Sequence, residues 1–284
     1  MIWLNHYNKM KYMQELNNFI NGNRFANIAD FVIDFDHHEL TMDFYKHDSI
    51  IFCKTDFLNL LFDHIKFSNR KYILITHMSD YPIDKHRFDK APPSIVKWYA
   101  QNAVYDHPKL VSVPLGLGNN KGKSKAPTWY KYDWFVENTS ILRARWKEQD
   151  TLYCNWNPDT NQEVRKPILQ KLKANINIKH ESGLSFETYC NNMSYYKFVV
   201  CPPGNGADTH RLWEALYLGC YPITLRNRIY RDYNLPILQV DDWSEVTSDL
   251  VNKFYWDWNG QPYHHELQMS HWEKIIKNEI SLHI

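Results

Sequence analysis

The chain alternates short apolar runs with amphipathic stretches, and this rhythm constrains the fold more than any other feature of the sequence. The first half predicts strands at residues 31–35, 49–53, 72–77 and 109–117. The second half is more regular and predicts strands at 151–156, 176–180, 198–202 and 221–225, with helices at 163–175, 185–193 and 209–219. Short strands that alternate with helices are typical of βαβ units, so the pattern predicts an α/β fold with parallel sheets.

A polar segment, residues 119–128, interrupts the pattern and is expected to be an exposed connection. The chain of 284 residues is long enough for one large domain or two ordinary ones. We expect two Rossmann-like domains that face each other across a cleft, residues 1–148 and 149–284, with the last helix packing back on the first domain. One uninterrupted sheet is the alternative.

Charge and cysteine content exclude several classes of protein. Lys plus Arg number 33 and Asp plus Glu number 32, so the chain lacks the basic excess of a nucleic-acid-binding protein. The five cysteines are scattered without metal-type spacing, and we expect reduced core thiols in a cytoplasmic protein. Because there is no apolar run of about 18 residues, neither a signal peptide nor a membrane span is expected.

The segment "FVVCPPGNGADTHRLWEALYLGCYPITL", residues 198–225, carries many polar groups between two apolar runs. After the first run, two prolines stop the strand, and Gly204 and Gly206 allow backbone angles that other residues avoid. The helix is expected to begin at Thr209 or His210, with Asp208 or Thr209 as N-cap, and to end before a glycine at 219.

One face of this helix is apolar, and His210, Arg211 and Glu214 share another face. A helix N-terminus beside glycines suits phosphate oxygens, and the forked guanidinium of Arg211 suits the same oxygens. Glu214 could accept hydrogen bonds from two ribose hydroxyls. A diphosphate linked to a ribose fits this arrangement, with contacts expected from Pro203, Gly204, Asn205, Gly206, Asp208 and His210. The alternative is a surface ion pair between Arg211 and Glu214.

Residues 198–223 resemble the nucleotide-sugar signature of exostosin-like glycosyltransferases and related soluble enzymes of microbes and large algal viruses. The segments "ITHMSD" (75–80), "WYAQN" (98–102) and "VPLGLGN" (113–119) extend a looser resemblance over roughly residues 72–240. The resemblance implies the two-domain GT-B fold and an inverting, metal-independent transfer of a sugar from a nucleotide diphosphate to a glycan acceptor. It also implies a UDP-sugar donor, with UDP-xylose a candidate, a diphosphate-binding Arg211 and a ribose-binding Glu214. Membrane-bound exostosins begin with an anchor that we do not expect here, which argues against heparan-type substrates.

Other polar residues are expected to complete the site. Asn155, Asn157 and Arg165 follow the first strand of the second domain and could converge on the phosphates, or they could belong to a solvated helix start. Asp80 and, as second choice, His77 follow a buried strand and are candidate catalytic bases, although Asp80 could instead cap the turn before Pro82. Asn102 and Asn119 could line the acceptor side or simply form turns.

Two alternative functions remain open. Asp34, Asp36, His37 and His38 follow a strand and could hold Mg²⁺ or Mn²⁺ in a GT-A-like transferase or a phosphohydrolase, but no glycine-rich cradle follows them. The 11 Trp and 19 Tyr could instead mark a non-catalytic carbohydrate-binding protein, with residues 255–265 as its exposed aromatic segment. We expect no metal and no cofactor, since the nucleotide sugar is a co-substrate.

Overall fold

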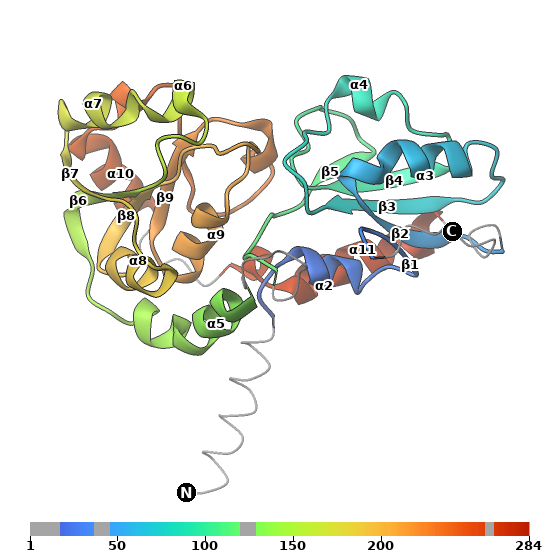
Figure 1. Cartoon of the computed structure of the whole chain (residues 1–284), viewed down its shortest axis with the longest axis horizontal. Helices are drawn as coiled ribbons and strands as arrows, with labels where there is room; N and C mark the ends of the chain where they lie inside the picture. The colour runs from blue at the N-terminus through green and yellow to red at the C-terminus, as the bar shows by residue number, and fades with distance from the viewer. Residues whose placement is uncertain (1–17, 37–45, 120–128, 259–263, 284) are drawn as a thin grey trace, which may run out of the picture.

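A computed structural model describes residues 18–36, 46–119, 129–258 and 264–283, and it shows two lobes side by side (Figure 1). Each lobe contains a five-stranded sheet. The expected α/β fold with two Rossmann-like domains is confirmed, and the alternative of one uninterrupted sheet is wrong. In the part of the chain covered by these four ranges, no helix combines the length and apolar character needed to cross a bilayer.

The N-terminal sheet has the order β1-β2-β3-β4-β5, and every neighbouring pair is parallel. Its strands are β1 (Phe31–Ile33), β2 (Ser49–Lys54), β3 (Tyr72–His77), β4 (Ile95–Ala100) and β5 (Leu110–Ser112). The helices of this lobe are α2 (Gly22–Ala26), η2 (Thr55–Phe57), α3 (Leu58–Ile65) and α4 (Lys85–Phe88). Strand β4 was not expected, and the strand expected at 109–117 stops after three residues.

The winding of this sheet explains which helices cover it. Right-handed crossovers between strands in sequential order all pass over the same face, which carries α3 and α4. Alternate strand residues such as Ile51 and Leu74 pack toward that face, whereas Ile50 and Ile73 belong to the core of the other face. That second face is covered by α2 and by the last helix, α11 (Met269–His283), which returns from the C-terminal lobe (Figure 1).

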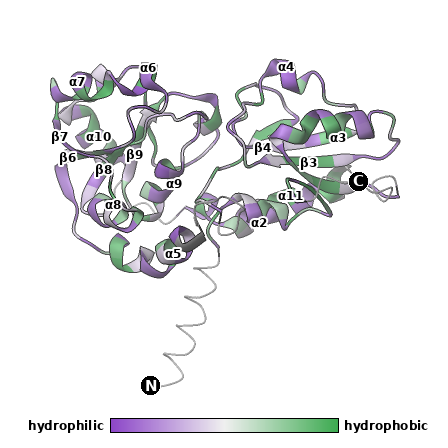
Figure 2. Cartoon of the chain, viewed as in Figure 1, coloured by the Kyte–Doolittle hydropathy of each residue, from purple (hydrophilic) through white to green (hydrophobic). Residues whose placement is uncertain are grey.

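Helix α11 is held on the N-terminal sheet by apolar and polar contacts. Met269, Trp272 and Ile276 are buried in the core of this face. Glu279 accepts a hydrogen bond from the Tyr99 hydroxyl at 3.0 Å and lies 3.7 Å from the Lys97 ammonium. Figure 2 shows apolar and polar residues side by side along α11, as in a helix that covers a sheet with one face.

The C-terminal sheet has the order β10-β9-β8-β6-β7 and is also parallel. Its strands are β6 (Glu148–Asn155), β7 (Asn177–Glu181), β8 (Tyr196–Val200), β9 (Tyr221–Leu225) and β10 (Leu238–Val240). Its helices are α5 (Trp129–Arg143), α6 (Gln162–Arg165), α7 (Ile168–Lys173), α8 (Phe186–Met193), α9 (His210–Tyr217), η3 (Arg228–Tyr230), η4 (Trp243–Glu245), α10 (Ser248–Trp258) and η5 (His265–Leu267). Strand order reverses between β6 and β8, and ligands of doubly wound sheets bind outside the carboxyl ends of the strands at such a switch point.

Two features of this lobe differ from the sequence prediction. The helix expected at 163–175 is divided into α6 and α7, with Pro167 as the N-cap of α7, because proline cannot donate inside a helix. Helix α5 lies before the domain boundary expected at residue 148, yet its Phe135 shares a core cluster with Tyr153 and Trp213 of the C-terminal lobe. All five cysteines are buried and unpaired.

Candidate functional site

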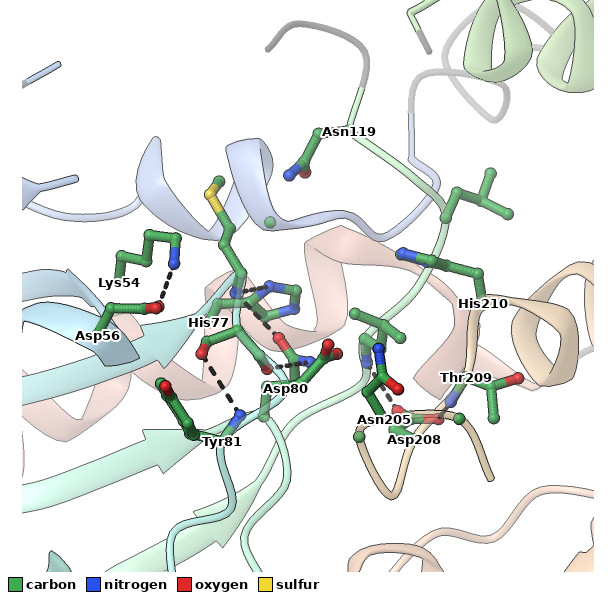
Figure 3. Close-up of a pocket in the computed structure, with 18 residues that line it drawn as sticks. Lys54, Asp56, His77, Asp80, Tyr81, Asn119, Asn205, Asp208, Thr209 and His210 are labelled. Atoms are coloured by element: carbon green, nitrogen blue, oxygen red, sulfur yellow. Dashed lines mark hydrogen bonds and ion pairs between the residues drawn. The ribbon is translucent and has the colours of Figure 1, made fainter. Parts of the chain in front are cut away.

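A cleft of about 630 Å³ lies between the two lobes at the carboxyl ends of their strands. Its N-terminal side is formed by the loops after β2 and β3 and by the segment that crosses from β5 toward the other lobe. Its C-terminal side is formed by the loop after β8 and the start of α9 (Figure 3). Among the predicted site residues, the cleft is lined by His77, Asp80, Gly204, Asn205, Gly206, Asp208 and His210. Its size is that of a small-molecule site.

The loop after β8 is tight for a reason that differs from the one expected. Neither Gly204 nor Gly206 adopts the left-handed backbone conformation, although the Gly204 amide does bond to the Gly206 carbonyl at 3.1 Å. Gly206 instead marks a close approach between the lobes. A Cβ there would lie 3.1 Å from Asn102 Nδ2 and 3.2 Å from Asp80 Oδ1, closer than side-chain carbons usually pack.

Helix α9 begins at His210 with Thr209 as N-cap, within the range expected from the sequence. At its other end, the amides of Gly219 and Cys220 bond to the carbonyls of Leu216 and Ala215. This is a Schellman motif, and Gly219 provides the required positive φ of 71°. These two ends fix which residues the first turn of α9 presents to the cleft.

Asp208 was expected to contact the donor, but the structure gives it a different role. Its buried carboxylate accepts hydrogen bonds from the Leu115 amide at 3.0 Å and from the Thr209 amide at 2.7 Å. Trp213 Nε1 and the Tyr230 hydroxyl also donate to it, at 2.9 and 3.0 Å. Both oxygens of this carboxylate already accept hydrogen bonds, and its negative charge would repel a phosphate. Asp208 therefore connects the two lobes and is not a phosphate ligand.

His210 is exposed at the start of α9 and points into the cleft (Figure 3). Its Nδ1 lies 2.8 Å from the carbonyl oxygen of Gly116 in the crossing segment. Because a carbonyl can only accept, Nδ1 carries the proton, and Nε2 is left to face a ligand. The expected contact between His210 and the phosphates stays a prediction.

Arg211 and Glu214 lie on α9 but outside the lining of the cleft. Glu214 is buried and accepts a hydrogen bond from the Tyr189 hydroxyl at 2.9 Å. Arg211 lies with its guanidinium 5.8 Å from the centre of the Tyr189 ring and makes no ion pair with a described residue. Its buried Nε has no hydrogen-bond partner there either. The alternative of a surface ion pair between Arg211 and Glu214 is therefore wrong.

Arg165 is buried and already satisfied. Its guanidinium donates to the carbonyls of Pro203 at 2.9 Å, Asn157 at 3.1 Å and Pro202 at 3.4 Å. The expected direct contacts from Arg165 and Pro203 to phosphate are thus replaced by a bond that fixes the loop. Burial, and after it the charge of Arg211, lowers the pKa of Arg165 to about 10. Half-buried Asn155 ends β6 at the switch point, outside the cleft lining.

Asp80 is an exposed residue of the cleft, in the loop after β3 (Figure 3). Two buried residues that follow β4 hold this loop, because Gln101 Nε2 and Asn102 Nδ2 both donate to the Ser79 carbonyl, at 2.9 and 3.2 Å. Asn102 Oδ1 also accepts from the Asp208 amide at 3.0 Å, so one side chain connects Asp80's loop to the opposite lobe. Asn102 therefore joins the two lobes. Asn119, which also lines the cleft, accepts a hydrogen bond from the Asn23 amide.

His77, the second candidate base, is unsuited to that role. Its Nδ1 accepts from the Met78 amide at 2.8 Å, and its Nε2 therefore donates to the Pro114 carbonyl at 3.0 Å. Burial lowers the pKa of His77 to about 4, and nearby His210 acts in the same direction. A neutral ring with both nitrogens engaged cannot take a substrate proton without breaking these bonds.

The N-terminal side of the cleft is also lined by three residues that were not predicted from the sequence, Lys54, Asp56 and Tyr81. The Lys54 ammonium forms an ion pair with the Asp56 carboxylate. Burial acts to raise the pKa of Asp56, but hydrogen bonds from Lys54 and Ser79 outweigh it and hold that pKa below its usual range. The only signal in the sequence was the position of "KTD" directly after a predicted strand.

The residues of the two alternative functions lie away from the cleft lining. Asp34 and Asp36 follow the edge strand β1, where Asp34 Oδ1 accepts the Asp36 amide at 2.9 Å, and His37 and His38 fall outside the described residues. No cluster of three His, Cys, Asp or Glu suited to a metal occurs among the residues with described positions. Of the aromatic segment 255–265, Trp256 is exposed, and 259–263 lie outside the description.

No family model matches the chain. A similar solved structure is that of a pneumococcal O-GlcNAc transferase, GtfA, in complex with UDP and GlcNAc. The two chains are 12% identical with a TM-score of 0.38, over 83% of this chain and 57% of that one. The present chain thus spans little more than half of that transferase.

Proposed function

We propose that the protein is a glycosyltransferase that moves a sugar from a nucleotide diphosphate donor to the hydroxyl of a glycan. The observation that carries the proposal is Arg211. Arg211 lies in the first turn of α9, which follows β8 at the switch point of the sheet. It makes no ion pair with a described residue, its buried Nε has no partner there, and its charge acts on that of Arg165. Two cations that repel each other and have no ion pair among the described residues favour a ligand that carries negative charge, such as a diphosphate.

The donor would bind along the C-terminal lobe. Its diphosphate lies at the N-terminus of α9, near Arg211 and His210 Nε2, with the Gly204–Gly206 loop above it. Glu214 would take a ribose hydroxyl with the carboxylate oxygen that does not bond to Tyr189. We propose UDP as the nucleotide and xylose as one candidate sugar. Both choices rest on the sequence resemblance.

The acceptor would bind along the N-terminal lobe, where Asp80 is the proposed base. Asp80 takes the proton of the acceptor hydroxyl as its oxygen forms a bond to the anomeric carbon. The bond from that carbon to the phosphate oxygen breaks on the opposite side, and the electron pair leaves with the diphosphate. Base and leaving group then belong to opposite lobes, so the configuration at the anomeric carbon inverts. Exposed Asp80 is better placed than Asp56, which is paired with Lys54.

We also propose that the transfer needs no metal ion. The leaving diphosphate would be stabilised by Arg211, by the positive end of α9 and by the field of Arg165, whose charge persists although its donors are occupied. No step of the proposed reaction is routed through Asp34 or Asp36.

Isothermal titration with UDP, GDP and dTDP tests the proposal. UDP is expected to bind the wild-type protein and to bind Arg211→Ala at least about tenfold more weakly, since one charge-assisted contact is lost. Arg226→Ala is the matched control, because Arg226 pairs with Asp241 on the exposed side of the same lobe. Equal binding to both variants would remove Arg211 from the site. Glycan binding without any nucleotide binding would favour the carbohydrate-binding alternative.

A further inference from the structure

A second hollow, of about 370 Å³, lies on the N-terminal lobe between α3 and the segment that contains α4. Its apolar floor includes Leu58 and Phe62, and the rest of its lining is polar. Asp56 and Tyr81 line both this hollow and the interlobe cleft. The two spaces therefore adjoin, and an extended ligand that reaches Asp80 could continue across Tyr81 into the hollow.

The hollow carries more uncompensated positive than negative charge. Its positive charges come from Arg87 and Lys90, and His86 also lines it. Within the described chain, neither His86 nor Lys90 has an ion pair, and the guanidinium of Arg87 has only neutral partners: the Pro82 carbonyl at 2.8 Å and an aromatic ring.

The two carboxylates of the lining are both occupied. Asp56 is paired with Lys54, and Asp84 caps α4 by accepting the Arg87 amide at 2.8 Å. They nonetheless reduce the positive field, so the lining suits a single negative charge better than a dianion such as a phosphate monoester.

Tyr81 marks the boundary between the two spaces and is 51% exposed. The guanidinium of Arg87 lies 4.9 Å from the centre of its ring. This contact holds the ring in place by a cation–π interaction and keeps the guanidinium at the edge of the hollow. A fixed aromatic ring beside polar groups offers an apolar surface to the face of a sugar ring.

We infer that the hollow is a distal acceptor subsite that binds the carboxylate of an acidic sugar, at least one residue away from the sugar whose hydroxyl reaches Asp80. The acceptor would then be an oligosaccharide that contains uronic acid. Arg87 and Lys90 bind the carboxylate, and Tyr81 supports the sugar between the hollow and the cleft. The assignment of the hollow as an acceptor site rests on the proposed function. The preference for a carboxylate follows from the lining alone.

Direct binding of matched oligosaccharides tests the inference without any donor. The probes are trigalacturonate, a hyaluronan tetrasaccharide and trimannuronate, each compared with its methyl ester, which keeps the sugar and removes the charge. At least one acid is expected to bind about tenfold or more tightly than its ester, with an affinity that falls as salt is added. Failure of all three acids to bind at millimolar concentration, or equal binding of acids and esters, overturns the inference.

Variants locate the effect. Lys90→Gln and Arg87→Ala should each reduce the preference for acid over ester, and Lys90→Gln also serves if Arg87→Ala fails to fold. Lys66→Gln is the control, since Lys66 is an exposed cation after α3 that does not line the hollow. A preference that survives Lys90→Gln and Arg87→Ala would place the acid elsewhere. Tighter binding of a sulfated galactan tetrasaccharide, which has no carboxylate, than of all three carboxylated probes would contradict the carboxylate assignment.

The two proposals can fail separately. If none of the three nucleotides binds but the acids bind through Arg87 and Lys90, the subsite stands and the transferase proposal falls. If UDP binds through Arg211 but the acids do not bind, the donor site stands and the acidic acceptor is wrong.

Discussion

Replacing Asp208 by Asn should destabilise the protein although it removes no volume. Oδ2 of the carboxylate accepts from the Leu115 amide and from Trp213 Nε1, at 3.0 and 2.9 Å. Oδ1 accepts from the Thr209 amide and the Tyr230 hydroxyl, at 2.7 and 3.0 Å. Every group around the carboxylate is therefore a hydrogen-bond donor. The NH₂ group of Asn is also a donor, and it would take the place of one of the two oxygens that these groups need as acceptors.

The size of the effect follows from this geometry. In either orientation of the amide, one buried backbone N–H loses its acceptor, which costs about 1–3 kcal/mol. The hydrogen bonds that remain lose the assistance of the charge, which reduces each of them by roughly 1 kcal/mol. Burial raises the pKa of Asp208, so the neutral amide also avoids part of the cost of burying a charge. A net loss of about 2–4 kcal/mol is therefore expected, against the roughly 5–15 kcal/mol that stabilises a typical domain.

Urea unfolding followed by tryptophan fluorescence measures this loss, since buried Trp213 contacts the altered residue. Asp241→Asn is the control, because Asp241 is an exposed carboxylate paired with Arg226 and its loss should cost no more than about 1 kcal/mol. A loss below about 1 kcal/mol for Asp208→Asn, or one equal to the control, would refute the role of Asp208 as a connection between the lobes.

Three other outcomes are expected. Asp80→Asn should keep donor affinity, measured by titration, but lower kcat by about 10²–10⁴, and normal turnover would remove Asp80 as the base. Transfer should survive EDTA, and complete loss with recovery on added Mn²⁺ would direct attention to Asp34 and Asp36 instead. Because the pKa of His77 falls from 6.5 to about 4 on folding, the unfolded state binds the extra proton between these values, and stability should fall as pH drops from 6.5 toward 4. In urea titrations across this range, His77→Gln should show a shallower loss than the wild type, and identical slopes would contradict the assignment.

Features set by neighbouring residues could be predicted from the sequence, whereas features set by distant partners could not. The limits of α9 were predictable because its N-cap, its first turn and Gly219 all lie within one short segment. The role of Asp208 was not, because its partner Leu115 is 93 residues away. The role of Arg165 was predicted wrongly for the same reason, since the carbonyls that accept its hydrogen bonds belong to the loop after β8.

The architecture shows the same division. The regular second half predicted most strands of the C-terminal sheet, because each is followed by an amphipathic helix. Strand β4 was missed although most of its residues are buried, because two prolines precede it and no long helix follows. Lys54 and Asp56 follow a correctly predicted strand, but only the folded chain shows that they face the same cleft as Asp80.

The two lobes depend on each other through the same contacts that shape the cleft. A sheet wound in one direction leaves one face without crossovers, and in the N-terminal lobe that face is covered by α11, which follows the whole C-terminal lobe in sequence. Conversely, the loop that begins α9 is held by Asn102, Leu115 and Gly116 of the N-terminal side. A fragment cut between the lobes would therefore lose either a face of its sheet or the supports of the proposed phosphate site. The proposed donor and acceptor sites would therefore both require the joined lobes, because the residues that orient each of them come from both.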